Sequence, residues 1–183
     1  MAEKKAASVR IEPLEMRHAP FIQRYASDAA VAATTTLPHP YPENGAKEFV
    51  RYDRSRREKG VSFTYAVIAE DSFVGVCGID LDKRGREGKP EIGYWIGKPF
   101  WGRGYGYAAA RAVLTRVFSE RGYPIIVSRS LTHNPASIRI LEKCGFQPDG
   151  EEEDARGTVA CFILKKDDYE RTNQAKEKND GGE

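Results

Sequence analysis

The alternation of apolar and polar positions along the chain predicts a series of β-strands. The clearest case places Phe63, Tyr65 and Val67 on one parity, so that one face of the strand is apolar. The charged, glycine-rich residues 82–89 are expected to form a hairpin loop between two strands. Strands are predicted at residues 62–69, 73–81, 91–96, 123–131 and 158–164, after a short first strand around Val9 and Ile11.

Apolar residues that recur every three or four positions predict helices among these strands. The strongest signal covers residues 104–122, where one helical face carries Ala110, Val113, Leu114, Val117 and Phe118. Other helices are predicted at 20–30, 44–59 and 134–145, the last of which opens with Asn134-Pro135 and closes at Gly145. Three prolines within residues 37–42 exclude a helix or a central strand there.

The order of these elements favours an α/β (α+β) domain in which a mixed, mostly antiparallel central sheet has helices on both faces. With 183 residues the chain has room for one domain, which we place at residues 8–166. Residues 1–7 and 167–183 are expected to be flexible tails, because the latter mix both charge signs with little apolar content.

Composition excludes several function classes. Lys+Arg (29) and Asp+Glu (27) nearly balance, so the net charge of +2 gives no global signal for nucleic acid or for an anionic membrane. No apolar run approaches the roughly 18 residues of a membrane span, and the N-terminus has no apolar core of a secretion signal, so we expect a cytoplasmic protein. Cys77, Cys144 and Cys161 are widely spaced without a C-x-x-C pair; we expect buried free thiols and no metal site.

The densest chemical signal is the loop Trp101-Gly102-Arg103-Gly104-Tyr105-Gly106, which lies between a predicted strand and the 104–122 helix. Glycines let backbone N–H groups face an anion, and a helix start adds unpaired donors and the positive end of its dipole. Phosphate oxygens are therefore the natural ligand of this turn. The loop lacks the Gly-Lys-Ser/Thr ending of a P-loop, and it does not lie in an opening βαβ unit as a dinucleotide fingerprint would.

Two sequence blocks resemble the GNAT N-acetyltransferase superfamily. The segment from Glu91-Ile-Gly-Tyr-Trp-Ile96 through the glycine loop resembles its acetyl-CoA-binding motif, Gln/Arg-x-x-Gly-x-Gly/Ala, with Trp101 at the first position. The segment Asn134-Pro-Ala-Ser137-Ile-Arg-Ile-Leu141-Glu-Lys-Cys-Gly-Phe146 is similar to a second block, Asn-x-x-Ser-x-x-x-Leu-Glu-Lys-x-Gly-Phe. With Pro38-His-Pro-Tyr41, these blocks resemble the branch of ribosomal-protein-alanine N-acetyltransferases, and the likeness covers roughly residues 8–164.

The resemblance implies the GNAT fold, with acetyl-CoA as co-substrate. The cofactor-binding residues that it implies are Trp95, Ile96, Trp101, Gly102, Arg103, Gly104, Tyr105, Gly106, Asn134 and Ser137. Leu141 occupies the position at which many relatives carry a tyrosine proton donor, and the branch implies Ser137 as the catalytic group beside the thiolate instead. Glu91 is our first candidate for the catalytic base, followed by His133 and His39.

Each of these assignments has a structural alternative. Asn134 also reads as a helix N-cap, Ser137 can satisfy the same helix start, and Glu91 can be an ordinary charge at a strand end.

We expect transfer of an acetyl group from acetyl-CoA to a primary amine, first of all a protein N-terminal α-amine. The alternatives are a small-molecule amine, a non-catalytic CoA-binding module, and an RNA or ribosome adaptor that uses the basic run at 51–59. The expected partners are acetyl-CoA and the amine acceptor, without a membrane and without nucleic acid. The identity of the acceptor and the oligomeric state stay open.

Overall fold

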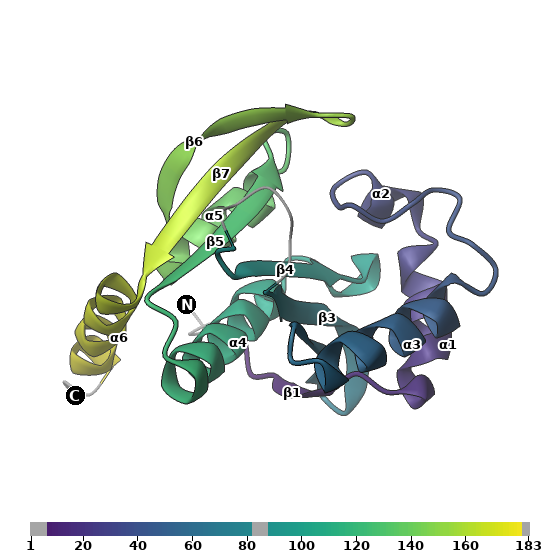
Figure 1. Cartoon of the computed structure of the whole chain (residues 1–183), viewed down its shortest axis with the longest axis horizontal. Coiled ribbons are helices and arrows are strands. Elements are labelled where there is room, and N and C mark those ends of the chain that lie inside the picture. The colour runs from purple at the N-terminus through teal and green to yellow at the C-terminus, as the bar shows by residue number, and fades with distance from the viewer. Residues whose placement is uncertain (1–6, 82–87, 181–183) are drawn as a thin grey trace, which may run out of the picture.

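A seven-stranded sheet forms the centre of the computed structural model, which describes residues 7–81 and 88–180 (Figure 1). The strands follow the spatial order β1-β2-β3-β4-β5-β7-β6, and every neighbouring pair is antiparallel except the parallel pair β4–β5. The predicted mixed, mostly antiparallel sheet is confirmed. The strands are β1 (Arg10–Pro13), β2 (Ser62–Ala69), β3 (Ser72–Asp80), β4 (Glu91–Ile96), β5 (Ile125–Leu131), β6 (Gln147–Asp154) and β7 (Gly157–Lys165).

Helices cover both faces of the sheet, as the sequence predicts. On one face, α1 (Ala19–Ala26), α2 (Ala29–Ala32) and α3 (Gly45–Glu58) enclose a core that includes Ile22, Val31, Val50 and Trp95. On the other, α4 (Tyr105–Arg121) and α5 (Pro135–Cys144) enclose a larger core that includes Val113, Leu114, Leu141 and Phe162. All three cysteines are buried thiols outside any disulfide, as expected. No helix in the described ranges is long and apolar enough to cross a membrane.

The C-terminal segment differs from the prediction of a flexible tail after residue 166. It forms helix α6 (Lys166–Asp180), in which Tyr169 is only 3% exposed. The Tyr169 hydroxyl lies 2.7 Å from the Thr115 Oγ1 on α4 and donates to the Arg111 carbonyl, so one aromatic residue docks an otherwise polar helix. The predicted tail at 1–7 and the hairpin loop at 82–89 fall mostly outside the described residues.

Strand β6 has no counterpart among the predicted strands. Its residues are nearly all exposed and polar, because β6 is the last strand of the sheet and pairs on one side only, with β7. An edge strand of this kind carries no apolar alternation for a sequence pattern to detect. The β6–β7 hairpin extends beyond the sheet toward the end of the molecule that contains α2 (Figure 1).

Candidate active site

The parallel strands β4 and β5 separate almost as soon as they meet, and this separation creates the site. Their register contains one pair in the described chain, Glu91 with Val127, next to a 2.8 Å bond from the Val127 N–H to the Pro90 carbonyl. Beyond that pair the strands diverge toward α2 (Figure 1). The buried Ser128 hydroxyl donates to the Ile92 carbonyl at 3.0 Å and replaces the ladder bond that is lost there.

Backbone groups of β4 face this opening. The Gly97 N–H donates to the Val74 carbonyl at 2.8 Å, one position beyond the pair Gly75–Ile96. Because hydrogen-bonded and non-hydrogen-bonded pairs alternate in an antiparallel ladder, this bond identifies which residues of β4 bond to β3. In that alternation, Ile92, Tyr94 and Ile96 direct their N–H and C=O groups away from β3, toward the opening. The Ser128 hydroxyl donates to the Ile92 carbonyl, and the Trp101 indole donates to the Ile96 carbonyl at 2.6 Å. The backbone groups of Tyr94 lie between these two bonds, in the middle of the opening.

A cleft of about 890 Å³ passes through the opening and reaches both faces of the sheet. Of the site residues predicted from the sequence, Arg103 and the third base candidate, His39, are exposed and do not line the cleft, whereas His133 and the others do. The others are Glu91, Trp95, Ile96, Trp101, Gly102, Gly104, Tyr105, Gly106, Asn134 and Ser137. The sheet divides the cleft into a half under α4 and α5 and a half under α3, which we call the cofactor half and the acceptor half.

The glycine loop lies at the cofactor half, where α4 begins. Gly102 (φ +75°) and Gly104 (φ +82°, the N-cap of α4) are left-handed, a conformation that favours glycine. Gly106 has a different task, because a Cβ there would stand 2.9 Å from the Cδ1 of Ile140 on α5. The Tyr105 side chain is buried in the core and its hydroxyl donates to Glu70, so this residue offers the cleft its backbone. The unpaired N–H groups of the first turn of α4 suit the phosphate oxygens of a CoA.

Asn134 caps α5 and also ties it to the end of α2. Its Oδ1 accepts from the Ser137 N–H at 3.1 Å, as the cap interpretation predicts, and its Nδ2 donates to the Thr34 carbonyl at 3.2 Å. Neighbouring side chains make similar bonds: His133 Nε2 lies 3.3 Å from the Ala33 carbonyl, and Arg156, in the β6–β7 turn, donates to the Thr35 carbonyl at 3.0 Å. Three consecutive carbonyls after α2 thus accept hydrogen bonds from side chains that line the cleft.

Ser137 lies in the first turn of α5, and its hydroxyl meets a residue that the sequence analysis did not assign. The Tyr94 hydroxyl lies 3.1 Å from the Ser137 Oγ and 3.3 Å from the Ser137 carbonyl oxygen. Burial raises the pKa of the Tyr94 hydroxyl, so it stays protonated. The strand alternation gave a signal for this position, because Tyr94 shares the parity of Ile92 and Ile96, which face α4 and α5.

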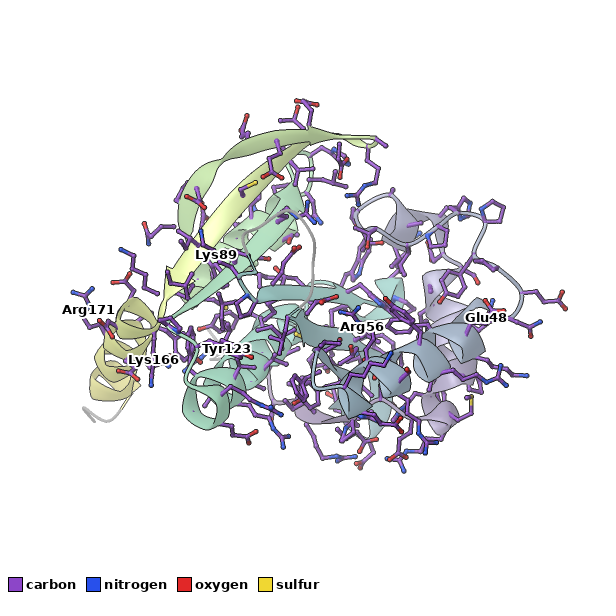
Figure 2. The ribbon with its side chains drawn as sticks, in the orientation of Figure 1. Glu48, Arg56, Lys89, Tyr123, Lys166 and Arg171 are labelled. Atoms are coloured by element: carbon purple, nitrogen blue, oxygen red, sulfur yellow. The ribbon has the colours of Figure 1, made fainter. Side chains whose placement is uncertain are left out.

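The acceptor half contains three carboxylates, each close to an arginine. Asp80 lies 2.6 Å from Arg56, whose side chain is near the middle of the molecule (Figure 2). The Glu91 Oε1 lies 3.2 Å from the Arg129 Nε, and the Asp53 Oδ2 lies 3.8 Å from Arg57 Nη1. Glu91 is 5% exposed and lines the cleft, and its role as the base stays a prediction. No group of His, Cys, Asp and Glu in the described ranges is arranged to hold a metal ion.

The chain resembles known proteins in sequence and in fold. Residues 8–147 match the family profile described as the Acetyltransferase (GNAT) domain. YkkB of Bacillus subtilis, an uncharacterized protein, is 38% identical over 104 residues, which are 55% of this chain and 59% of that protein. The chain therefore spans less than two thirds of that relative's length.

Solved structures share the fold at low sequence identity. RimL, a ribosomal α-N-protein acetyltransferase in complex with coenzyme A, has a TM-score of 0.77 at 16% identity and covers 86% of this chain and 94% of its own. The spermidine N-acetyltransferase from Vibrio cholerae, in complex with CoA and spermine, has a TM-score of 0.75 at 16% identity and covers 88% and 98%. These two proteins act on different amines, so the fold alone does not identify an acceptor.

Proposed function

Because the chain belongs to the GNAT acetyltransferase family, we propose that it transfers the acetyl group of acetyl-CoA to a primary amine, and that this amine is a protein N-terminal α-amine. One observation carries the proposal. The edge of β4 that no longer pairs with β5 crosses the cleft between the glycine loop at the start of α4 and the carboxylates under α3. A thioester bound from the cofactor half and an amine bound from the acceptor half would meet at Tyr94.

The proposed reaction needs few groups. The amine nitrogen attacks the thioester carbonyl, the C–S bond breaks with its electron pair on sulfur, and the amine loses a proton to a base. The Tyr94 N–H, directed into the opening, supports the charge that grows on the carbonyl oxygen. The Ser137 hydroxyl supports the thiolate, and Glu91 receives the amine proton directly or through a water.

The pKa of the acceptor favours an α-amine. An α-amine has a pKa of about 8, so about a tenth of it is neutral at pH 7, whereas a lysine amine near 10.4 is neutral only in about one molecule in 2,500. Glu91, the base candidate, forms an ion pair with Arg129. An acceptor amine that is already partly neutral at pH 7 needs less help from a base.

The charge balance of the acceptor half also bears on the choice. A polyamine needs carboxylates that can pair with several ammonium groups. Here Asp53, Asp80 and Glu91 each lie within 4 Å of an arginine. The arrangement therefore supports an acceptor with a single reacting amine, although the fold is also that of a spermidine acetyltransferase.

An acceptor screen tests the proposal. CoA thiol release is followed for the full chain with acetyl-CoA and equal concentrations of peptides with free N-termini, the same peptides with blocked N-termini and a free lysine, and spermidine. We expect the highest kcat/KM with free N-termini. A preference for lysine or spermidine would move the acceptor to those classes, and CoA binding by calorimetry without transfer to any amine would leave a binding module.

A further inference from the structure

A pair of hydroxyl groups connects the two sides of the cleft at the point where the thioester would lie. Tyr94 comes from β4 and Ser137 from α5, and their oxygens are 3.1 Å apart. Both side chains are half-buried and both residues line the cleft. Resting on the proposed function, we propose that Tyr94 is a positioning residue that acts through Ser137: its phenol donates to the Ser137 Oγ, which turns the serine hydrogen toward the leaving thiolate.

The direction of this bond follows from what each group can do. A serine in the first turn of a helix can turn its hydrogen toward a nearby backbone group, and then it offers a ligand only its oxygen. A tyrosine that remains protonated supplies a donor to that oxygen, and burial raises the pKa of Tyr94 and keeps its proton in place. When the Ser137 oxygen accepts from Tyr94, the serine hydrogen is free to donate into the cleft.

The bond also strengthens the donor. Hydroxyl groups in a chain polarise one another, so a serine that accepts from a phenol donates more strongly to an anion. As the C–S bond breaks, the electron pair goes to sulfur, and the Ser137 hydrogen bond stabilises the resulting thiolate. No proton needs to leave Tyr94 or Ser137, because a thiol with a pKa of about 8.5 leaves readily as the thiolate and takes its proton from water afterwards.

Strand β4 supplies the phenol that α5 lacks. The position four residues after Ser137 is Leu141, whose side chain is fully buried in the core and cannot reach the cleft as a donor. Tyr94 brings its hydroxyl to the same helix end from the opposite strand. The phenol has one hydrogen, so donation to the Ser137 Oγ at 3.1 Å and donation to the Ser137 carbonyl at 3.3 Å are alternatives, and the proposal uses the shorter of the two.

A double-mutant cycle tests the inference on the full chain. Tyr94→Phe removes the hydroxyl and keeps the ring, and Ser137→Ala removes its partner. Under single-turnover conditions with acetyl-CoA and the best acceptor, we expect Tyr94→Phe to slow transfer threefold to tenfold and Ser137→Ala about tenfold or more. The double variant should be no slower than Ser137→Ala alone, because Tyr94 acts on the leaving sulfur only through the Ser137 hydroxyl.

A matched control separates this role from stability. Tyr169→Phe also removes a buried tyrosine hydroxyl with two hydrogen-bond partners, but far from the cleft on α6. It should lower the melting temperature and leave the transfer rate unchanged, whereas Tyr94→Phe should lower the rate with the acetyl-CoA dissociation constant unchanged.

Two outcomes would overturn the inference. Wild-type transfer rates in Tyr94→Phe would remove the tyrosine from the reaction, and an equal slowing by Tyr94→Phe in the presence and absence of Ser137 would show that it acts independently. Failure of the proposed function is distinguishable, because the wild-type chain itself would then release no CoA with any amine.

Discussion

Gly93 provides the sharpest test of how the acceptor reaches the cleft. It lies in β4 with its side-chain position on the face of Glu91 and Trp95, in the acceptor half, and a Cβ placed there meets no atom within 4 Å. Gly78, paired with it on β3, is different, because a Cβ there would stand 2.8 Å from the Phe63 carbonyl oxygen. A side chain at Gly93 would therefore enter the cleft without disturbing the fold.

The two effects of Gly93→Val have opposite signs. Replacing a strand glycine with a β-branched residue restricts the unfolded chain and suits the strand, which stabilises the protein by about 0.5–1 kcal/mol. For a chain of this length that raises the melting temperature by about 1–4 °C. The valine methyl groups occupy space over Tyr94 that the amine needs, and a displacement of about 1 Å costs on the order of 100-fold in rate, or about 2.7 kcal/mol.

The assay measures the two substrates separately. We expect Gly93→Val to bind CoA with wild-type affinity by calorimetry, because the glycine loop lies on the other face of the sheet, and to lose about 100-fold in kcat/KM for the acceptor. Gly93→Ala should lie between the valine variant and the wild type, since its methyl group fills less of the cleft. A folded Gly93→Val protein with wild-type kcat/KM would refute the placement of the acceptor over β4.

Two further predictions concern the glycine loop and the buried carboxylate. Gly104→Val should weaken CoA binding at least tenfold by calorimetry. The control Gly122→Val strains a similarly left-handed glycine (φ +67°) at the other end of α4 and should lower only the melting temperature. Equal CoA affinity in both variants would contradict the phosphate site. Burial raises the pKa of Asp53 above 3.8, so the folded state holds this proton more tightly than the unfolded state, and stability falls as pH rises through that window. Asp53→Asn should therefore gain stability relative to wild type between pH 4 and pH 7 in urea unfolding, and an unchanged difference would show that Arg57 compensates the charge fully.

Sequence patterns predict those elements of this fold that bury many apolar residues. Strands β2, β3 and β5 bury residues of both parities between helices on the two faces of the sheet, and α4 buries one side, so their apolar residues stand out in the sequence. Strand β6 buries neither face, and α6 is held mainly by Tyr169, so neither pattern stands out. Elements whose stability depends on one neighbour in space leave little trace along the chain.

The same division applies to the site. The glycine loop, the Asn134 cap and the Ser137 position are local features, because the groups that cooperate lie within four residues of one another. The contacts of Tyr94 with Ser137 and of Glu91 with Arg129 join segments about 40 residues apart in sequence, so they depend on how strands and helices meet. The bond from Asn134 to Thr34 spans an even longer stretch and gives a helix cap a second partner.

Alternation along β4 assigns the two substrates to different residues. Ile92, Tyr94 and Ile96 face α4 and α5, whereas Glu91, Gly93 and Trp95 face α3 and its charges. A strand that loses its neighbour on one side exposes backbone donors between these two sets, and each set remains anchored by the ladder with β3. Substitutions at even positions of β4 should therefore affect acetyl-CoA and the leaving thiolate, and those at odd positions the amine. The side chain of Trp95, which the sequence resemblance implies as cofactor-binding, lies on the acceptor face instead. The short parallel contact at Glu91 is thus what allows one strand to serve both substrates without placing their binding groups on the same face.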